Sequence, residues 1–108
     1  MALAGTWDFE TFELPEKASE ESKSSLPDLI SSYQGQGYTF TSDGKCKGFH
    51  KNGPPENGEY RYYPERRNLI IDVGGDIYPL TILQLNKSTL KMLHRKESIT
   101  IILKKRAN

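Results

Sequence analysis

The sequence predicts an all-β fold, an eight-stranded antiparallel up-and-down meander closed into a small barrel, with one short helix between the first two strands. Short runs of alternating apolar and polar residues recur along the chain, as in strands that have one buried and one solvent-exposed face. Most links between them are short turns, so successive strands should pair as neighbours. A meander of this size avoids exposed edges by closing, which pairs the last strand with the first. At 108 residues, we expect a single domain over residues 1–108.

The first strand carries the only tryptophan of the chain. Trp7 and Phe9 point to one side of this strand, and Asp8 and Glu10 point to the other. The alternation loses its phase after Thr11, which predicts a bulge or a sharp bend there. Such a bend lets one strand turn the corner of a closed sheet.

The segment over residues 16–37 is rich in Glu, Ser and Lys and does not alternate as a strand does. Its apolar residues have helical spacing: Leu26, Leu29, Ile30 and Tyr33. Together with Ser25 as a capping residue, they predict a short amphipathic helix over about residues 26–33.

The other strands follow from alternation and from turn residues between the runs. They are expected over residues 38–41, 46–50, 58–63, 69–73, 77–85, 89–95 and 98–104. Residues 51–57 contain two prolines and are expected to form a loop. Pro79 cannot donate a hydrogen bond to a neighbouring strand, so an irregularity is expected near it.

Charge is balanced over the whole chain but not along it. Lys and Arg total 15 against 14 Asp and Glu, so the net charge of +1 provides no field that would attract nucleic acid. Acids are concentrated in residues 1–30 and bases in residues 85–108. Barrel closure explains this, because it places Asp8 and Glu10 beside the basic end of the last strand. The alternative is a basic patch for nucleic acid, which the lack of interleaved aromatics in this stretch disfavours.

No pattern indicates catalysis, a metal site or a cofactor. Cys46 is the only cysteine, and His50 and His94 lack further ligands at metal-binding spacing. Glu59 and Asp72 fall on the outward phase of their strands. We therefore predict a protein that is not an enzyme, with no catalytic residue.

Four stretches, in this order, resemble short bacterial lipocalin-like domains of the type common in Bacteroidetes, often as secreted or envelope lipoproteins. They are Gly5-Thr6-Trp7, residues 38–45, Gly58-Glu59-Tyr60 and residues 101–105. The resemblance implies a calycin-like barrel whose tryptophan packs at the closed end beneath a basic side chain. Trp7 is the matching tryptophan, and the candidate partners that close the barrel are Arg95, Lys104 and Arg106. The chain is shorter than typical lipocalins and lacks their disulfide and C-terminal helix, so the resemblance does not imply a roomy interior.

The resemblance also bears on location. The first residues have neither a basic region nor an apolar run of signal-peptide length, and no stretch is long enough to span a membrane. We expect a soluble monomer, in the bacterial cell envelope or secreted if a leader has been removed, and otherwise in the cytoplasm.

The inward phase predicts a binding site for a small hydrophobic ligand. It mixes large aromatics with small or polar groups, where a core that is only packed favours Leu, Ile and Val. The long 16–37 segment could close over the barrel mouth as a lid. The alternative is that its helix plugs the end of the barrel and completes the core. The candidate ligand-binding residues are Phe9, Leu29, Tyr33, Tyr38, Phe40, His50, Tyr60, Tyr62, Tyr78 and Met92. The alternative is an interaction module with a filled core, which binds a protein or a cell-envelope component.

Overall fold

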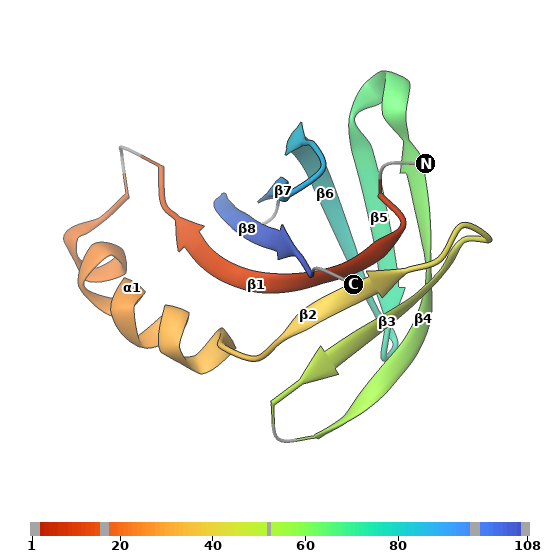
Figure 1. The fold of residues 1–108 in the computed structure, drawn as a ribbon. Helices are drawn as coiled ribbons and strands as arrows, with labels where there is room; N and C mark the ends of the chain where they lie inside the picture. Colours follow the sequence, from red (N-terminus) through yellow and green to blue (C-terminus); the bar gives the residue numbers. More distant parts are fainter. Residues whose placement is uncertain (1–2, 16–17, 52, 96–97, 107–108) are drawn as a thin grey trace.

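The computed structural model describes residues 3–15, 18–51, 53–95 and 98–106. Its eight strands form one closed antiparallel barrel in sequence order, as the alternation predicted (Figure 1). The strands are β1 (Gly5–Glu13), β2 (Gly37–Phe40), β3 (Lys45–His50), β4 (Gly53–Tyr63), β5 (Asn68–Val73), β6 (Asp76–Leu85), β7 (Thr89–His94) and β8 (Ile99–Lys105). The helix α1 (Glu20–Tyr33) joins β1 to β2, and a short 3-10 helix η1 (Pro64–Arg66) joins β4 to β5.

Pairing of β1 with β8 closes the barrel, as predicted. The register of this pair shifts between Phe9 and Thr11, which confirms the expected bulge. The charges on the outer side also meet as expected: Arg106 lies 2.6 Å from Asp8, and Lys104 lies 3.4 Å from Glu10. Such exposed pairs contribute about 1 kcal/mol or less each, but they favour this register of the two strands.

The core lies inside the barrel and draws side chains from β1 to β8. Its fully buried members include Trp7, Phe40, Leu69, Ile71, Leu80, Leu90, Met92 and Leu103. No charged or polar residue is buried among the residues that the structure describes. The buried core of the barrel is therefore apolar.

The helix is longer than the sequence predicted. It was expected over residues 26–33 with Ser25 as its cap, but it begins at Glu20 with Ser19 as the capping residue. The prediction began the helix at Leu26 because the polar residues before it show no apolar spacing, yet a helix needs an apolar face only where it packs. Pro27 lies inside the helix, where it removes one backbone donor. None of the residues of α1 is fully buried.

The predicted loop over residues 51–57 is also wrong, because β4 begins at Gly53. In this part β4 pairs with β3, through Gly48 with Glu56 and His50 with Gly53. Its pairing with β5 begins only at Gly58. Prolines are tolerated in such a stretch because one side of the strand has no neighbour that needs its N–H groups.

Pro79 sits in a regular part of β6, where it pairs with Ile70. Its carbonyl accepts a hydrogen bond of 3.4 Å from the N–H of Arg95. The register shift of β6 against β7 comes later, between Ile82 and Gln84, so the irregularity expected near Pro79 was misplaced.

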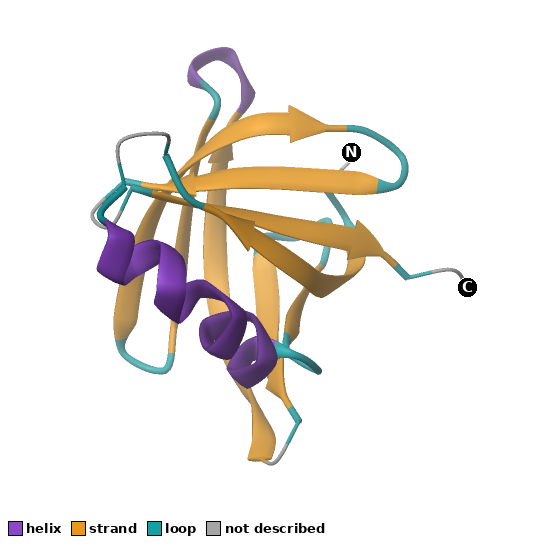
Figure 2. Ribbon diagram, turned by 90° about the vertical axis from the view of Figure 1, so that its left-hand side faces the viewer, coloured by secondary structure: helices purple, strands orange, loops and turns teal. Residues whose placement is uncertain are grey.

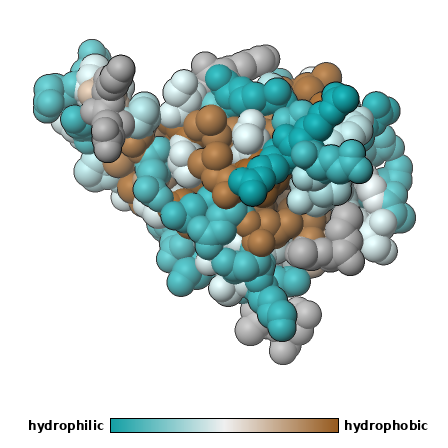
Figure 3. Space-filling model, turned by 90° about the horizontal axis from the view of Figure 1, so that it is seen from above, coloured by the Kyte–Doolittle hydropathy of each residue, from teal (hydrophilic) through white to brown (hydrophobic). Residues whose placement is uncertain are grey.

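Apolar side chains also reach the outer surface. Seen from above, they gather near the centre of one face with polar side chains around them (Figure 3). The large exposed apolar residues include Ile77, with 61% of its surface exposed, and Leu83, with 44%. No helix in the described ranges is long and apolar enough to cross a membrane.

Candidate functional site: an internal cavity beside the helix

The barrel contains a cavity of about 370 Å³, which is lined by residues of the strands and of α1. Seven of the ten predicted ligand-binding residues line it: Phe9, Leu29, Tyr33, Tyr38, His50, Tyr78 and Met92. They come from six different elements of the fold, β1, α1, β2, β3, β6 and β7. Those on the strands meet at one cavity because inward residues of a closed sheet share one interior, and their role in binding stays a prediction.

The other three predicted residues, Phe40, Tyr60 and Tyr62, are not part of the lining. Phe40 and Tyr60 are buried and pack edge to face, with ring centroids 5.0 Å apart. The Tyr60 hydroxyl donates a hydrogen bond to the carbonyl of Thr41. Tyr62 is half-buried and packs against the core. These rings help to fill the barrel interior away from the cavity.

Sequence reasoning missed several lining residues. Phe12 and Phe49 follow or flank register shifts, in β1 and in β3, where strict alternation fails. Glu56 was missed because its segment was expected to be a loop. His94 could have been found, since it lies two residues after Met92 and shares its inward phase. The further lining residues are Gln36, Gly37, Val73, Leu80, Ile99, Ile101 and Leu103.

The helix forms one wall of the cavity at its C-terminal end. It lies outside the strands, on the left in Figure 1 and in front of them in Figure 2. The Tyr33 ring packs 5.0 Å from the Phe12 ring and 5.9 Å from the Phe9 ring, measured between centroids. The N–H of Phe9 donates a 2.8 Å hydrogen bond to the carbonyl of Gln36. These contacts join the end of α1 to β1.

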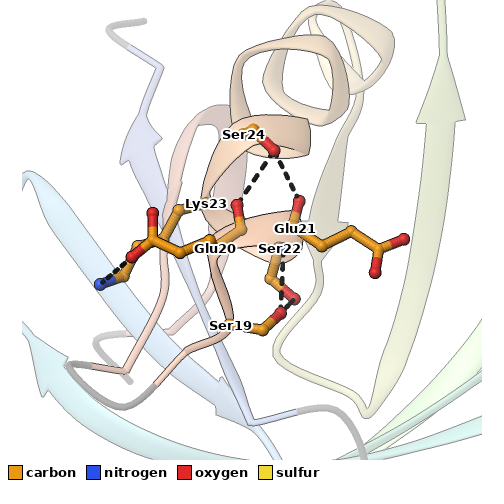
Figure 4. A network of polar contacts seen from close by, with 6 residues as sticks. All are labelled: Ser19, Glu20, Glu21, Ser22, Lys23 and Ser24. Carbon is orange, nitrogen blue, oxygen red and sulfur yellow. Dashed lines mark hydrogen bonds and ion pairs between the residues drawn. The ribbon is translucent and has the colours of Figure 1, made fainter.

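The beginning of α1 is stabilised by local polar contacts rather than by burial (Figure 4). The Ser19 hydroxyl accepts a 3.1 Å hydrogen bond from the N–H of Ser22, which is worth about 1 kcal/mol in a typical cap. The Ser24 hydroxyl donates to the carbonyls of Glu20 and Glu21 at 3.0 and 3.1 Å. This end of the helix is exposed, so α1 packs against the barrel through its C-terminal half, where Leu26, Leu29 and Ile30 contact the core.

The polar groups in the cavity are few and poorly paired. Burial raises the pKa of Tyr38 to about 12, with smaller contributions from the nearby Tyr78, Cys46 and Tyr33, so its hydroxyl stays protonated at neutral pH. Burial, and then Asp76, raise the pKa of Tyr78, whose hydroxyl donates a long 3.4 Å hydrogen bond to the Asp76 carboxylate.

His94 is the second polar group of the interior. Its Nδ1 is buried and has no hydrogen-bond partner among the described residues. Its ring packs edge to face against Tyr78, with centroids 6.1 Å apart. His50 also lines the cavity, at its exposed rim. The fold thus brings together two histidines that lie far apart in the sequence.

Trp7 occupies a different part of the interior and is fully buried. Its indole N–H donates a 2.9 Å hydrogen bond to the carbonyl of Leu3. The cation over its ring is Lys105, with Nζ 5.6 Å from the ring centroid. None of the three proposed partners takes this place: Lys104 pairs with Glu10, Arg106 pairs with Asp8, and the backbone of Arg95 bonds to Pro79.

The described residues contain no group of three or more His, Cys, Asp or Glu side chains that could hold a metal ion. Cys46 is buried and has a free thiol. Burial raises its pKa to about 11, helped by the charges of Asp72 and Glu59. A thiol with a raised pKa is a poor nucleophile.

Solved structures show what this barrel resembles. A DUF4847 family protein from Bacteroides vulgatus superposes with a TM-score of 0.69 at 13% identity, over 100% of this chain and 96% of that one. A lipocalin-like protein from Bacteroides uniformis superposes with a TM-score of 0.66 at 16% identity, over 98% and 100% of the two chains. The chain has a lipocalin-like fold. The resemblance seen in the sequence is therefore confirmed for the architecture of this lipocalin-like barrel.

A third match, an uncharacterized protein from Bacteroides eggerthii, has a TM-score of 0.65 at 11% identity and covers 96% of this chain and 99% of that chain. No family model and no curated protein matches the sequence. At these identities the lipocalin-like barrel shares its fold with the three structures, and its function is argued from its own residues.

Proposed function

We propose that the barrel binds a small hydrophobic molecule in the cavity beside α1, without catalysis. The observation that carries the proposal is the cavity itself, whose volume of about 370 Å³ lies within the range of small-molecule sites. A barrel of eight strands is just wide enough either to be filled by side chains or to hold one small ligand. A cavity of this volume favours the second case over an interaction module with a filled core.

The lining supports the same function. Most of it is aromatic or aliphatic, and the polar groups are few, as in typical ligand sites. Tyr38 and His94 supply hydrogen-bonding groups that could orient a ligand. Leu29 and Tyr33 place the last turns of α1 at the cavity, so binding would involve the lid.

A titration with a neutral apolar dye, N-phenyl-1-naphthylamine, tests this function. We expect saturable dye fluorescence, with backbone amide shifts concentrated at Tyr38, Tyr78 and the last turns of α1. The variant Ile101→Trp adds a ring to a half-buried lining position and should weaken dye binding. Leu85→Trp is the matched control, because Leu85 is half-buried against the core but outside the lining.

Both variants are first compared with the native barrel by circular dichroism and thermal unfolding. Absence of saturable binding to the native protein would eliminate the proposed function. Equal loss of binding in Ile101→Trp and Leu85→Trp would show that the dye does not occupy this cavity.

A further inference from the structure

The charged group at the cavity is an acid. Glu56 lines the cavity and is exposed, and it forms no ion pair with any residue that the structure describes. None of the described lining residues is Lys or Arg. Lys51 packs its aliphatic stem beside Gly35, but it is not part of the lining. A charged ligand that enters here meets a negative carboxylate with no balancing cation in the wall.

The backbone makes room for this carboxylate. Gly74 has a positive φ of +63° in the turn between β5 and β6. A Cβ atom at this position would lie 2.5 Å from Oε2 of Glu56, which is closer than van der Waals contact allows. Glu56 therefore lies directly against this turn. The strand β6 begins just after the turn, at Asp76.

Asp76 adds a second negative charge near the same rim. Its carboxylate accepts the 3.4 Å hydrogen bond from the Tyr78 hydroxyl, and the ring of Tyr78 lines the cavity. Asp76 and Glu56 both contribute to the raised pKa of Tyr78, which agrees with two acids on this side. Together they produce a negative potential at the entrance to an apolar interior.

Aromatic rings form much of the wall: Phe9, Phe12, Tyr33, Tyr38, Phe49 and Tyr78. The face of an aromatic ring attracts cations. One of these rings already does so, since the guanidinium carbon of Arg106 lies 5.2 Å from the centroid of Phe49. The charge of Arg106 is matched by Asp8, to which it donates hydrogen bonds of 3.0 and 2.6 Å. The positive charges near this wall are therefore either paired or outside the lining.

We propose that the cavity selects organic cations, in which an ammonium group is attached to a small apolar body. This rests on the proposed function, and it adds the chemical class of the ligand. The apolar body occupies the interior beside Met92 and Leu80, and the ammonium group lies among the aromatic rings near Glu56. A carboxylate ligand of the same shape would meet Glu56 and Asp76 and be repelled.

Three probes with one apolar body test the charge preference: 4-phenylbutylamine, 4-phenylbutanol and 4-phenylbutyrate. They are titrated at about pH 8, above the range in which histidines usually titrate, with binding followed by calorimetry and amide shifts. We expect the amine to bind at least about fivefold more tightly than the alcohol, and the carboxylate most weakly, as partly screened charges allow.

The variant Glu56→Gln should reduce the advantage of the amine over the alcohol to less than about twofold. Glu59→Gln is the matched control, because Glu59 is an exposed acid of the same strand that pairs with Lys45 and does not line the cavity. It should leave the preference unchanged. Asp76→Asn should reduce the preference by less than Glu56→Gln does.

The outcomes separate the two proposals. Equal binding of the three probes would overturn the selection of cations and leave the binding of apolar ligands standing. A preference for the amine that is unchanged in both Glu56→Gln and Asp76→Asn would overturn the assignment of this selection to the two acids. If no probe and no neutral dye binds, both proposals fail.

Discussion

Removal of the Trp7 side chain should be one of the most destabilising single changes in this barrel. The ring is fully buried, and truncation of a buried tryptophan to alanine costs about 3–5 kcal/mol of unfolding free energy. Part of that cost is polar, because the Leu3 carbonyl loses its 2.9 Å hydrogen bond. A buried acceptor left without its donor costs about 1–3 kcal/mol.

Three variants divide this cost. Trp7→Ala should lower the unfolding free energy by about 3–5 kcal/mol, whereas Trp7→Phe keeps an aromatic ring and should lose about 1–3 kcal/mol, mainly the hydrogen bond. Lys105→Met removes the cation over the ring and should cost about 0.5–1 kcal/mol. Lys104→Met is the control, since its exposed pair with Glu10 is worth about 1 kcal/mol or less.

Urea unfolding, followed by circular dichroism because Trp7 is the only tryptophan, measures each difference. A loss below about 1 kcal/mol in Trp7→Ala would refute the argument, because it would mean that the indole contributes less than the burial of a single small side chain. Equal losses in Trp7→Phe and Trp7→Ala would assign the whole effect to the hydrogen bond.

Three other predictions concern single groups. The pKa of Tyr38 is raised from 10.0 to about 12. The stability that comes from its buried neutral hydroxyl is therefore fully present below pH 10 and is lost as the pH rises to 12. A spectrophotometric titration in which all tyrosines ionise together near pH 10 would contradict this prediction. Cys46, with its pKa raised to about 11, should react with iodoacetamide at least about tenfold more slowly in the folded than in the urea-unfolded protein, and equal rates would show an exposed thiol. Gly37→Ala should destabilise the barrel by about 1–3 kcal/mol, because its Cβ would lie 2.2 Å from the Trp7 carbonyl oxygen. Gly53→Ala is the control in the same chemical unfolding assay and should change stability by less than about 0.5 kcal/mol, because no described residue beyond its chain neighbours has an atom within 4 Å of the added Cβ.

The number of strands, their order and their closure follow from the sequence, because alternation and turn residues act locally and successive strands pair. The bulge after Phe9 was visible as a change of phase within a few residues. The meeting of Asp8 and Glu10 with the basic end of β8 was expected once closure was inferred, since closure places these strands side by side, and the structure shows which partners pair. In each case a short pattern and one topological rule were sufficient.

The helix start and the extent of β4 depended on contacts that no local pattern encodes. Ser19 and Ser25 are both chemically able to cap a helix, and the structure uses Ser19. Glu56 looked like part of a proline-containing loop, but its pairing with Gly48 makes it part of a strand and places it at the cavity. Register shifts decide such cases, because they change which side chains face inward.

The sequence alone determined that one apolar interior exists and that aromatic residues face it, because the pleat of a strand allows only two directions for each side chain. Only the tertiary structure decided which of these residues surround an open volume and which fill the barrel. Tyr38 and Phe40 share one strand and one phase, yet Tyr38 lines the cavity while Phe40 packs against Tyr60. The tertiary structure also decided that His50 and His94, which are far apart in the sequence, line one cavity. Where a side chain lies along the barrel axis depends on strand tilt and register, and these arise only when all the strands pair.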